Sequence, residues 1–115
     1  MKYPYHIEYT KFGLPVMRLP KKIKLVETLL FSDVQGSSGE YFLSEIDLVL
    51  QGKVPYSEIA GNVCGIEIKK DFTRVIDTLS VDGIGNTCAI ETLELRELIM
   101  IWSKISQKSV IPSNP

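Results

Sequence analysis

The sequence predicts a single α+β domain in which two helices pack on one antiparallel β-sheet. The 115 residues are 44% hydrophobic and 23% charged, values typical of one soluble globular domain. Apolar and polar residues alternate between residues 63 and 92, as in strands, whereas two other segments repeat apolar residues at the helical period. We expect the domain to span residues 1–108, and the polar residues 109–115, with two prolines, to form a flexible tail.

The first 36 residues are rich in β-branched and apolar residues and are interrupted by prolines and glycines, which predicts short strands and turns. Residues 16–19 fit a strand. The apolar run over residues 23–31 is ambiguous, because it could form a short helix or a strand buried on both faces; a strand is the favoured interpretation. The turn-forming residues that follow, 32–39, predict a loop.

A helix is predicted over about residues 38–51. Ser37 and Glu40 have the spacing of a capping box, in which the serine hydroxyl and the glutamate carboxylate satisfy backbone N–H groups at the start of a helix. Phe42, Ile46 and Val49 then recur on one helical face, and the glycine and proline that follow end the helix.

A three-stranded antiparallel meander and a second helix complete the predicted fold. Turn-forming residues separate the three alternating segments, which run over residues 63–69, 73–79 and 87–91. Thr92 is a suitable N-cap for a helix over residues 93–106. Its apolar stripe comprises Leu95, Leu98, Ile99, Trp102 and Ile105.

The cysteines and the histidine predict no catalytic or metal site. Cys64 and Cys88 are 24 positions apart, which fits neither a zinc knuckle nor a redox dithiol. Both lie in apolar alternating segments, so we expect free thiols in the core; a disulfide between neighbouring strands is the alternative. His6 has no nucleophile beside it in a recognisable motif. No metal or cofactor is predicted.

Charge is unevenly distributed along the chain. Residues 1–30 hold six basic and two acidic residues (net +4), whereas residues 31–103 hold five basic and twelve acidic ones (net −7). An acidic body is a poor nucleic-acid binder and a good partner for a basic protein. The sequence shows no secretory signal and no apolar run of membrane-spanning length, so we expect a cytoplasmic protein that contacts neither a membrane nor nucleic acid.

Part of the chain, residues 61–105, resembles a known family. The segments concerned are residues 61–68 (GNVCGIEI), 71–75 (DFTRV), 88–92 (CAIET) and 95–99 (LRELI), together with Trp102. They resemble the small immunity proteins of bacterial polymorphic-toxin systems, above all those of contact-dependent growth inhibition. The resemblance implies a non-catalytic cytosolic protein that binds the toxin domain of its own strain. We expect this protein to be a monomer or a weak homodimer. Such a toxin is often a nuclease with a basic cleft.

Carboxylates on a rigid scaffold can mimic a polyanionic substrate, and tyrosines beside them can anchor a partner. From charge distribution and expected exposure, the candidate partner-binding residues are Asp33, Glu40, Tyr41, Tyr56, Glu67, Asp71, Asp77 and Asp82.

Two other functions remain open at this point. A small adaptor or assembly subunit would show an exposed apolar patch or self-association. A hydrolase would need two of the carboxylates around the meander to share a pocket that separates their pKa values. We predict that the protein is not an enzyme.

Overall fold

The protein is described by a computed structural model that covers residues 2–34, 39–79 and 86–108. Its secondary structure comprises two antiparallel sheets and three α-helices, a compact α+β domain as predicted. The elements in chain order are β1 (His6–Tyr9), β2 (Pro15–Arg18), the 3-10 turn η1 (Lys21–Ile23), α1 (Lys24–Thr28), the π-helical turn η2 (Leu29–Val34), α2 (Glu40–Leu50), β3 (Ser57–Ala60), β4 (Cys64–Ile68), β5 (Phe72–Asp77), β6 (Thr87–Glu91) and α3 (Thr92–Lys108).

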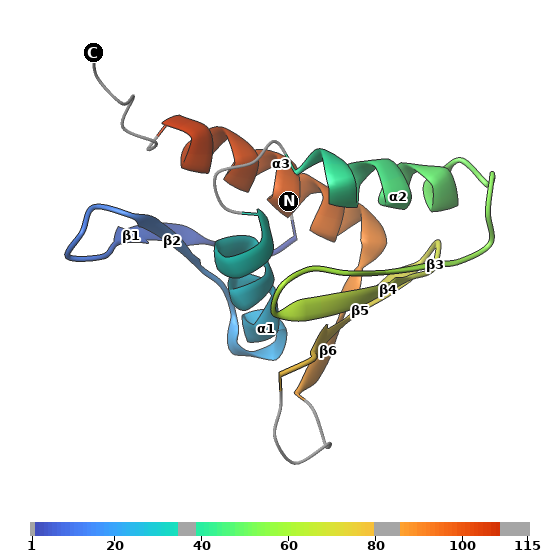
Figure 1. Ribbon diagram of the computed structural model, residues 1–115, viewed down its shortest axis with the longest axis horizontal. Coiled ribbons are helices and arrows are strands. Elements are labelled where there is room, and N and C mark those ends of the chain that lie inside the picture. The colour runs from blue at the N-terminus through green and yellow to red at the C-terminus, as the bar shows by residue number, and fades with distance from the viewer. Residues whose placement is uncertain (1, 35–38, 80–85, 109–115) are drawn as a thin grey trace.

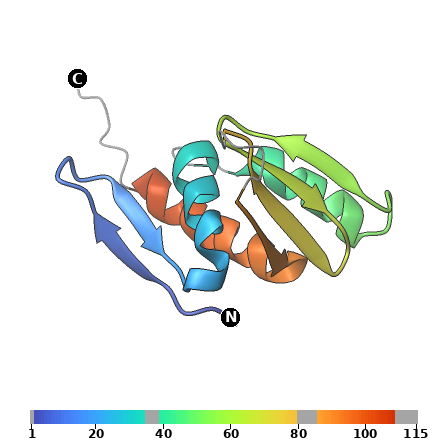
Figure 2. The same ribbon diagram turned by 90° about the horizontal axis from the view of Figure 1, so that it is seen from below.

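Strands β1 and β2 form a separate hairpin, and the other four strands form a sheet in the order β3-β4-β5-β6. Helices α2 and α3 lie across one face of the four-stranded sheet, and α1 lies between that sheet and the hairpin (Figures 1 and 2). The predicted meander is confirmed as β4, β5 and β6, but the fourth strand, β3, was not predicted. It pairs with β4 in antiparallel register, with Glu58 opposite Glu67.

The strand favoured over residues 23–31 is wrong, because this segment is helical. Ile23, Val26 and Leu30 are fully buried at spacings of three and four residues, which brings them to one face of a helix. Leu29 is also buried, and this extra apolar residue made the run resemble a strand buried on both faces. The helical conformation continues to Val34, so it also replaces the first residues of the predicted loop.

Helix α2 begins at Glu40, two residues later than predicted, with Gly39 at the N-cap position. Gly39 has φ 73°, and a Cβ atom there would lie 2.7 Å from Cγ2 of Ile99 in α3, so only glycine fits. The predicted serine cap falls on residues 37–38, which lie outside the described residues. The predicted C-terminal stop is confirmed: Gly52 has φ 74°, and the N–H of Lys53 donates to the carbonyl of Leu48 at 2.9 Å.

Helix α3 supplies much of the core. The predicted stripe residues Leu95, Leu98, Ile99 and Trp102 are fully buried against the inner face of the sheet and α2. Thr92 begins this helix, but its hydroxyl does not act as the predicted cap. The hydroxyl instead donates to the carbonyl of Lys69 at 2.6 Å and bonds the hydroxyl of Thr73 at 2.8 Å, which ties α3 to the β4–β5 turn.

None of the helices in the described part of the chain combines the length and apolar character that crossing a bilayer requires. The tail predicted over residues 109–115 lies outside the described residues.

Candidate partner-binding surface

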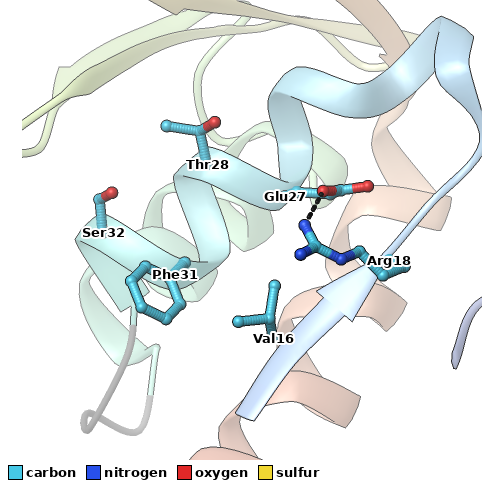
Figure 3. A pocket seen from close by; sticks show the side chains of 6 residues that line it. All are labelled: Val16, Arg18, Glu27, Thr28, Phe31 and Ser32. Atoms are coloured by element: carbon cyan, nitrogen blue, oxygen red, sulfur yellow. Dashed lines mark hydrogen bonds and ion pairs between the residues drawn. The ribbon is translucent and has the colours of Figure 1, made fainter. Parts of the chain in front are cut away.

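A hollow of about 270 Å³ lies between β2 and the first helical segment (Figure 3). Glu27 lines it and is only 7% exposed. One of its carboxylate oxygens accepts a hydrogen bond from Arg18 Nη1 at 3.1 Å, and the other accepts from the N–H of Leu19 at 2.8 Å. A buried carboxylate that is paired and hydrogen-bonded in this way joins α1 to β2 and is satisfied where it lies. Glu27 therefore has a structural role in this hollow, because it holds α1 against β2.

The acidic and aromatic side chains come together elsewhere, where α2 runs alongside the edge strand β3. The Tyr41 hydroxyl of α2 donates to the carbonyl of Ala60 in β3 at 3.4 Å. The Ser57 hydroxyl of β3 donates to the Glu45 carboxylate of α2 at 2.6 Å. We call this region the α2–β3 edge and define it by Glu40, Tyr41, Glu45, Tyr56 and Glu58.

Two carboxylates of the α2–β3 edge accept hydrogen bonds from hydroxyl groups. Glu45 accepts from the Ser57 hydroxyl and Glu58 from the Tyr56 hydroxyl, and neither hydroxyl neutralises a carboxylate. The hydrogen bond to Glu58 stabilises the protonated phenol and raises the pKa of Tyr56 to about 12. Tyr41 and Tyr56 are 56% and 38% exposed, so two aromatic rings flank charged, accessible groups.

Two carboxylates near this edge are paired with arginines. Glu67 of β4 forms an ion pair with Arg74 of β5, with 2.9 Å between oxygen and nitrogen. Asp47 of α2 forms one with Arg96 of α3 at 2.7 Å. Glu67 and Asp47 are thus engaged within the fold, whereas no ion pair involves Glu45 or Glu58 among the residues that the structure describes.

Three of the predicted residues belong to the segments that form the α2–β3 edge: Glu40 and Tyr41 lie in α2, and Tyr56 directly precedes β3. Glu67 lies beside them, opposite Glu58 in the register, and carries the ion pair described above. Sequence reasoning missed Glu45 and Glu58. Glu45 lies one helical turn after Tyr41, and Glu58 lies two residues after Tyr56 on the same side of a strand, so recognising β3 would have found Glu58.

Asp33 has a different environment from the one predicted. Its carboxylate accepts hydrogen bonds from three successive backbone N–H groups in the turn between β3 and β4. The donors are Asn62 at 2.6 Å, Val63 at 3.0 Å and Cys64 at 2.9 Å. Asp33 therefore attaches the end of η2 to the sheet, and its partner-binding role stays a prediction.

The three remaining predicted residues lie away from the α2–β3 edge or outside the description. Asp71 is exposed in the β4–β5 turn, at one end of β5. Asp77 lies at the other end of that strand and accepts a hydrogen bond from the N–H of Leu79 at 3.0 Å. Asp82 lies outside the described residues. The hydrolase alternative needed these carboxylates to share a pocket, and Asp71 and Asp77 do not.

The cysteines are free thiols in the described structure, as expected. Cys64 is fully buried, and burial raises the pKa of its thiol to about 12. Cys88 is half-buried, and burial raises its pKa as well. His6 is exposed, with its Nε2 2.9 Å from the Glu8 carboxylate. No cluster of metal-ligating side chains occurs among the residues that the structure covers.

These features define a small α+β protein whose accessible acidic and aromatic groups lie along an open edge. No family model matches the sequence, and no solved structure matches it. The chain is 52% identical over 102 residues to an immunity protein of Bacillus cereus, in an alignment that covers 89% of this chain and 86% of the relative. The chain belongs to this family of immunity proteins. The resemblance over residues 61–105 is thus confirmed at the level of an immunity protein, and the contact-dependent growth inhibition type stays a prediction.

Proposed function

We propose that this protein binds and neutralises a cognate bacterial toxin, that it does so without catalysing a reaction, and that the α2–β3 edge contacts the toxin. The immunity protein of Bacillus cereus supports the role. The observation that carries the choice of surface is the pair Glu45 and Glu58, whose carboxylates accept from hydroxyl groups and form no ion pair in the part of the chain that the structure describes. Complementary charge accelerates association and fixes the orientation of two proteins.

The tyrosines of the edge fit the same role. Tyrosine is enriched among the residues that dominate binding energy, because it buries a large ring and keeps a hydroxyl for hydrogen bonding. Tyr41 and Tyr56 are already held by hydrogen bonds to Ala60 and Glu58. Little side-chain entropy is then lost when a partner covers them.

We further propose that the toxin is a nuclease and that neutralisation takes place in the cytoplasm. A nuclease presents a basic cleft to the phosphate backbone of its substrate, and carboxylates on a rigid edge can occupy such a cleft. Free thiols at Cys64 and Cys88 are typical of a reducing compartment. Purified toxin domain should cleave RNA or DNA, and equimolar immunity protein should stop the cleavage. A toxin without nuclease activity would refute this part while leaving the binding surface to its own test.

The test of the surface is double charge reversal with a matched control. Glu45→Lys with Glu58→Lys should weaken binding to the toxin domain of the same strain by about a hundredfold or more, because each introduces repulsion toward a basic partner. Asp71→Lys with Glu97→Lys makes the same change in net charge at exposed positions outside the edge. Calorimetry measures affinity, and survival of cells that express the toxin measures protection. Equal loss in both double variants, or loss in neither, would contradict the proposed surface.

An adaptor role is the second candidate, and the β1–β2 hairpin is the observation that favours it. Phe12 and Tyr9 at its tip are 77% and 63% exposed. Thr10 holds the turn, because its hydroxyl accepts from the N–H groups of Phe12 and Leu14. An adaptor that uses this tip to self-associate should elute as a dimer in gel filtration and become monomeric on Phe12→Ser, whereas the immunity role requires neither result.

A further inference from the structure

A second hollow, of about 440 Å³, lies at the β6 edge of the four-stranded sheet, between the start of α1 and β6. Lys21, Lys22 and Lys24 line it from the helical side. Ile23 lies between these lysines in the sequence and is fully buried in the core. This anchor fixes the turn that carries the three ammonium groups.

These lysines form no ion pair in the described structure. The Lys22 ammonium lies 5.4 Å from the centre of the Tyr3 ring, which leaves its positive charge in place. Asp77 is the only carboxylate among the described residues that line the hollow, and it accepts a hydrogen bond from the N–H of Leu79. Among the described lining residues three cations face one anion, so this part of the hollow carries a positive field in a protein whose net charge is −1.

The remaining lining combines polar groups with an apolar patch. The side chains of Thr28, Thr87 and Asn86 can each donate a hydrogen bond, while Leu25 and Cys88 offer apolar contact. Small-molecule sites typically enclose roughly 300–1,000 Å³ and combine a few polar groups with apolar walls. The size and the lining of this hollow both match that description.

We propose that this hollow binds a phosphate-bearing ligand. The ammonium groups of Lys21, Lys22 and Lys24 contact the phosphate oxygens, and the Leu25–Cys88 side accommodates the organic part. Lysine binds phosphate well as a point charge, and the hydroxyl and amide donors complete the contacts. The site lies beside β6, whereas the α2–β3 edge lies at the opposite edge of the sheet (Figure 2). It is therefore independent of the proposed toxin contact.

Calorimetric titration of the full chain with three probes tests the proposal: inorganic tripolyphosphate, ATP and a six-nucleotide single-stranded RNA. Lys21→Gln with Lys24→Gln should weaken the binding of the tightest probe by about tenfold. Lys69→Gln with Lys70→Gln removes the same charge from the exposed β4–β5 turn and should leave the affinity unchanged. Asp77→Asn should bind more tightly, because it removes the opposing charge and keeps an oxygen that can accept the Leu79 N–H.

The probes also separate the sources of phosphate. Tighter binding of ATP than of tripolyphosphate indicates a nucleotide-like small molecule, and tightest binding of RNA with a steep salt dependence indicates a nucleic-acid backbone. Lys24→Gln alone, expected to weaken binding about threefold, gives the same readout if the double variant does not fold. Failure of all three probes to bind, or equal weakening in the two double variants, would overturn the proposal.

Discussion

The two edges of the four-stranded sheet differ in charge. At the β3 edge, Glu45 and Glu58 accept hydrogen bonds from hydroxyl groups. Beside β6, Lys21, Lys22 and Lys24 line a hollow and form no ion pair in the described structure. Between the edges, Glu67 and Arg74 neutralise each other. A chain with a net charge of −1 thus carries two oppositely charged surfaces, which its total charge conceals.

This difference indicates how one small sheet can serve two ligands. Charges that are paired within the fold stabilise it modestly and are engaged with each other, whereas Glu45 and Glu58 are held by hydroxyl groups. Each edge must therefore be positioned by residues other than the charged ones that face a partner. At the β3 edge this task falls to Asp33, and beside β6 it falls to the N-terminal residues that contact Glu91.

The largest effect is expected at the Asp33 anchor. Asp33→Ala removes the acceptor of three backbone N–H groups and should lower the free energy of unfolding by about 3 kcal/mol. Asp33→Asn keeps one acceptor oxygen and should cost roughly half as much. Urea denaturation measures both. Asp77→Asn, where the carboxylate accepts a single N–H from Leu79, is the control beside β6 and should cost less than about 1 kcal/mol. Equal losses at positions 33 and 77 would show that the two edges are anchored alike.

The next effect depends on pH and concerns the anchor beside β6. The Lys2 ammonium and the Tyr3 hydroxyl both bond the Glu91 carboxylate, the latter at 2.6 Å. These bonds, the one from Lys2 first, lower the pKa of Glu91 from an ordinary value of 4.5 to about 2. A carboxyl group with a lowered pKa adds stability above about pH 4.5 and loses it as the pH falls through about 2.

Glu91→Gln should therefore be less stable than the wild type near neutral pH and equally stable near pH 2, as measured by urea denaturation at each pH. A stability difference that persists unchanged into acid would show that the hydrogen bonds of Glu91 do not depend on its charge.

A titration tests the claim that a hydroxyl, not a cation, meets the charge of Glu58. The phenol of Tyr56 should ionise at about pH 12, and Glu58→Gln should return its pKa toward 10. Absorbance of the phenolate at alkaline pH, with Tyr56→Phe subtracted to remove the other tyrosines, measures this. An unchanged pKa in Glu58→Gln would show that another group causes the shift.

The smallest effect is expected in the middle of the sheet. Arg74→Ala breaks an ion pair whose arginine is exposed, and such pairs contribute only about 0.5 kcal/mol. Thermal unfolding measures the change. In the toxin-binding assay, the released Glu67 carboxylate should strengthen binding slightly if it belongs to the same acidic surface. Weaker binding would assign Arg74 itself to the interface.

The parts of the fold that sequence reasoning predicted correctly are those with a sustained period. Helix α3 repeats its apolar residues over several turns, and the meander alternates over three strands, so each pattern has few alternatives. The segment over residues 23–31 was wrongly favoured as a strand, because Leu29 adds an apolar residue to its helical stripe. Strand β3 has four residues and acquires its identity by pairing with β4, which no local pattern records.

The candidate site was predictable as a set of exposed residues but not as an arrangement. Tyr41 and Tyr56 were expected to be exposed, and they are. Which carboxylates form ion pairs depends on partners distant in sequence, such as Arg74 for Glu67 and Arg96 for Asp47. Composition gives the number of acids and bases, and only the fold decides how they are paired.

The orientation of the proposed toxin-facing helix depends on one missing methyl group. At Gly39 the backbone passes so close to α3 that a Cβ atom would lie 2.7 Å from Ile99 and 2.8 Å from the Ser103 hydroxyl. Any side chain at this position would push the start of α2 away from α3. Tyr41 lies two residues further along and would be carried away from Ala60. Gly39 thus sets the distance at which α2 and β3 meet, although it lies outside the surface that they form.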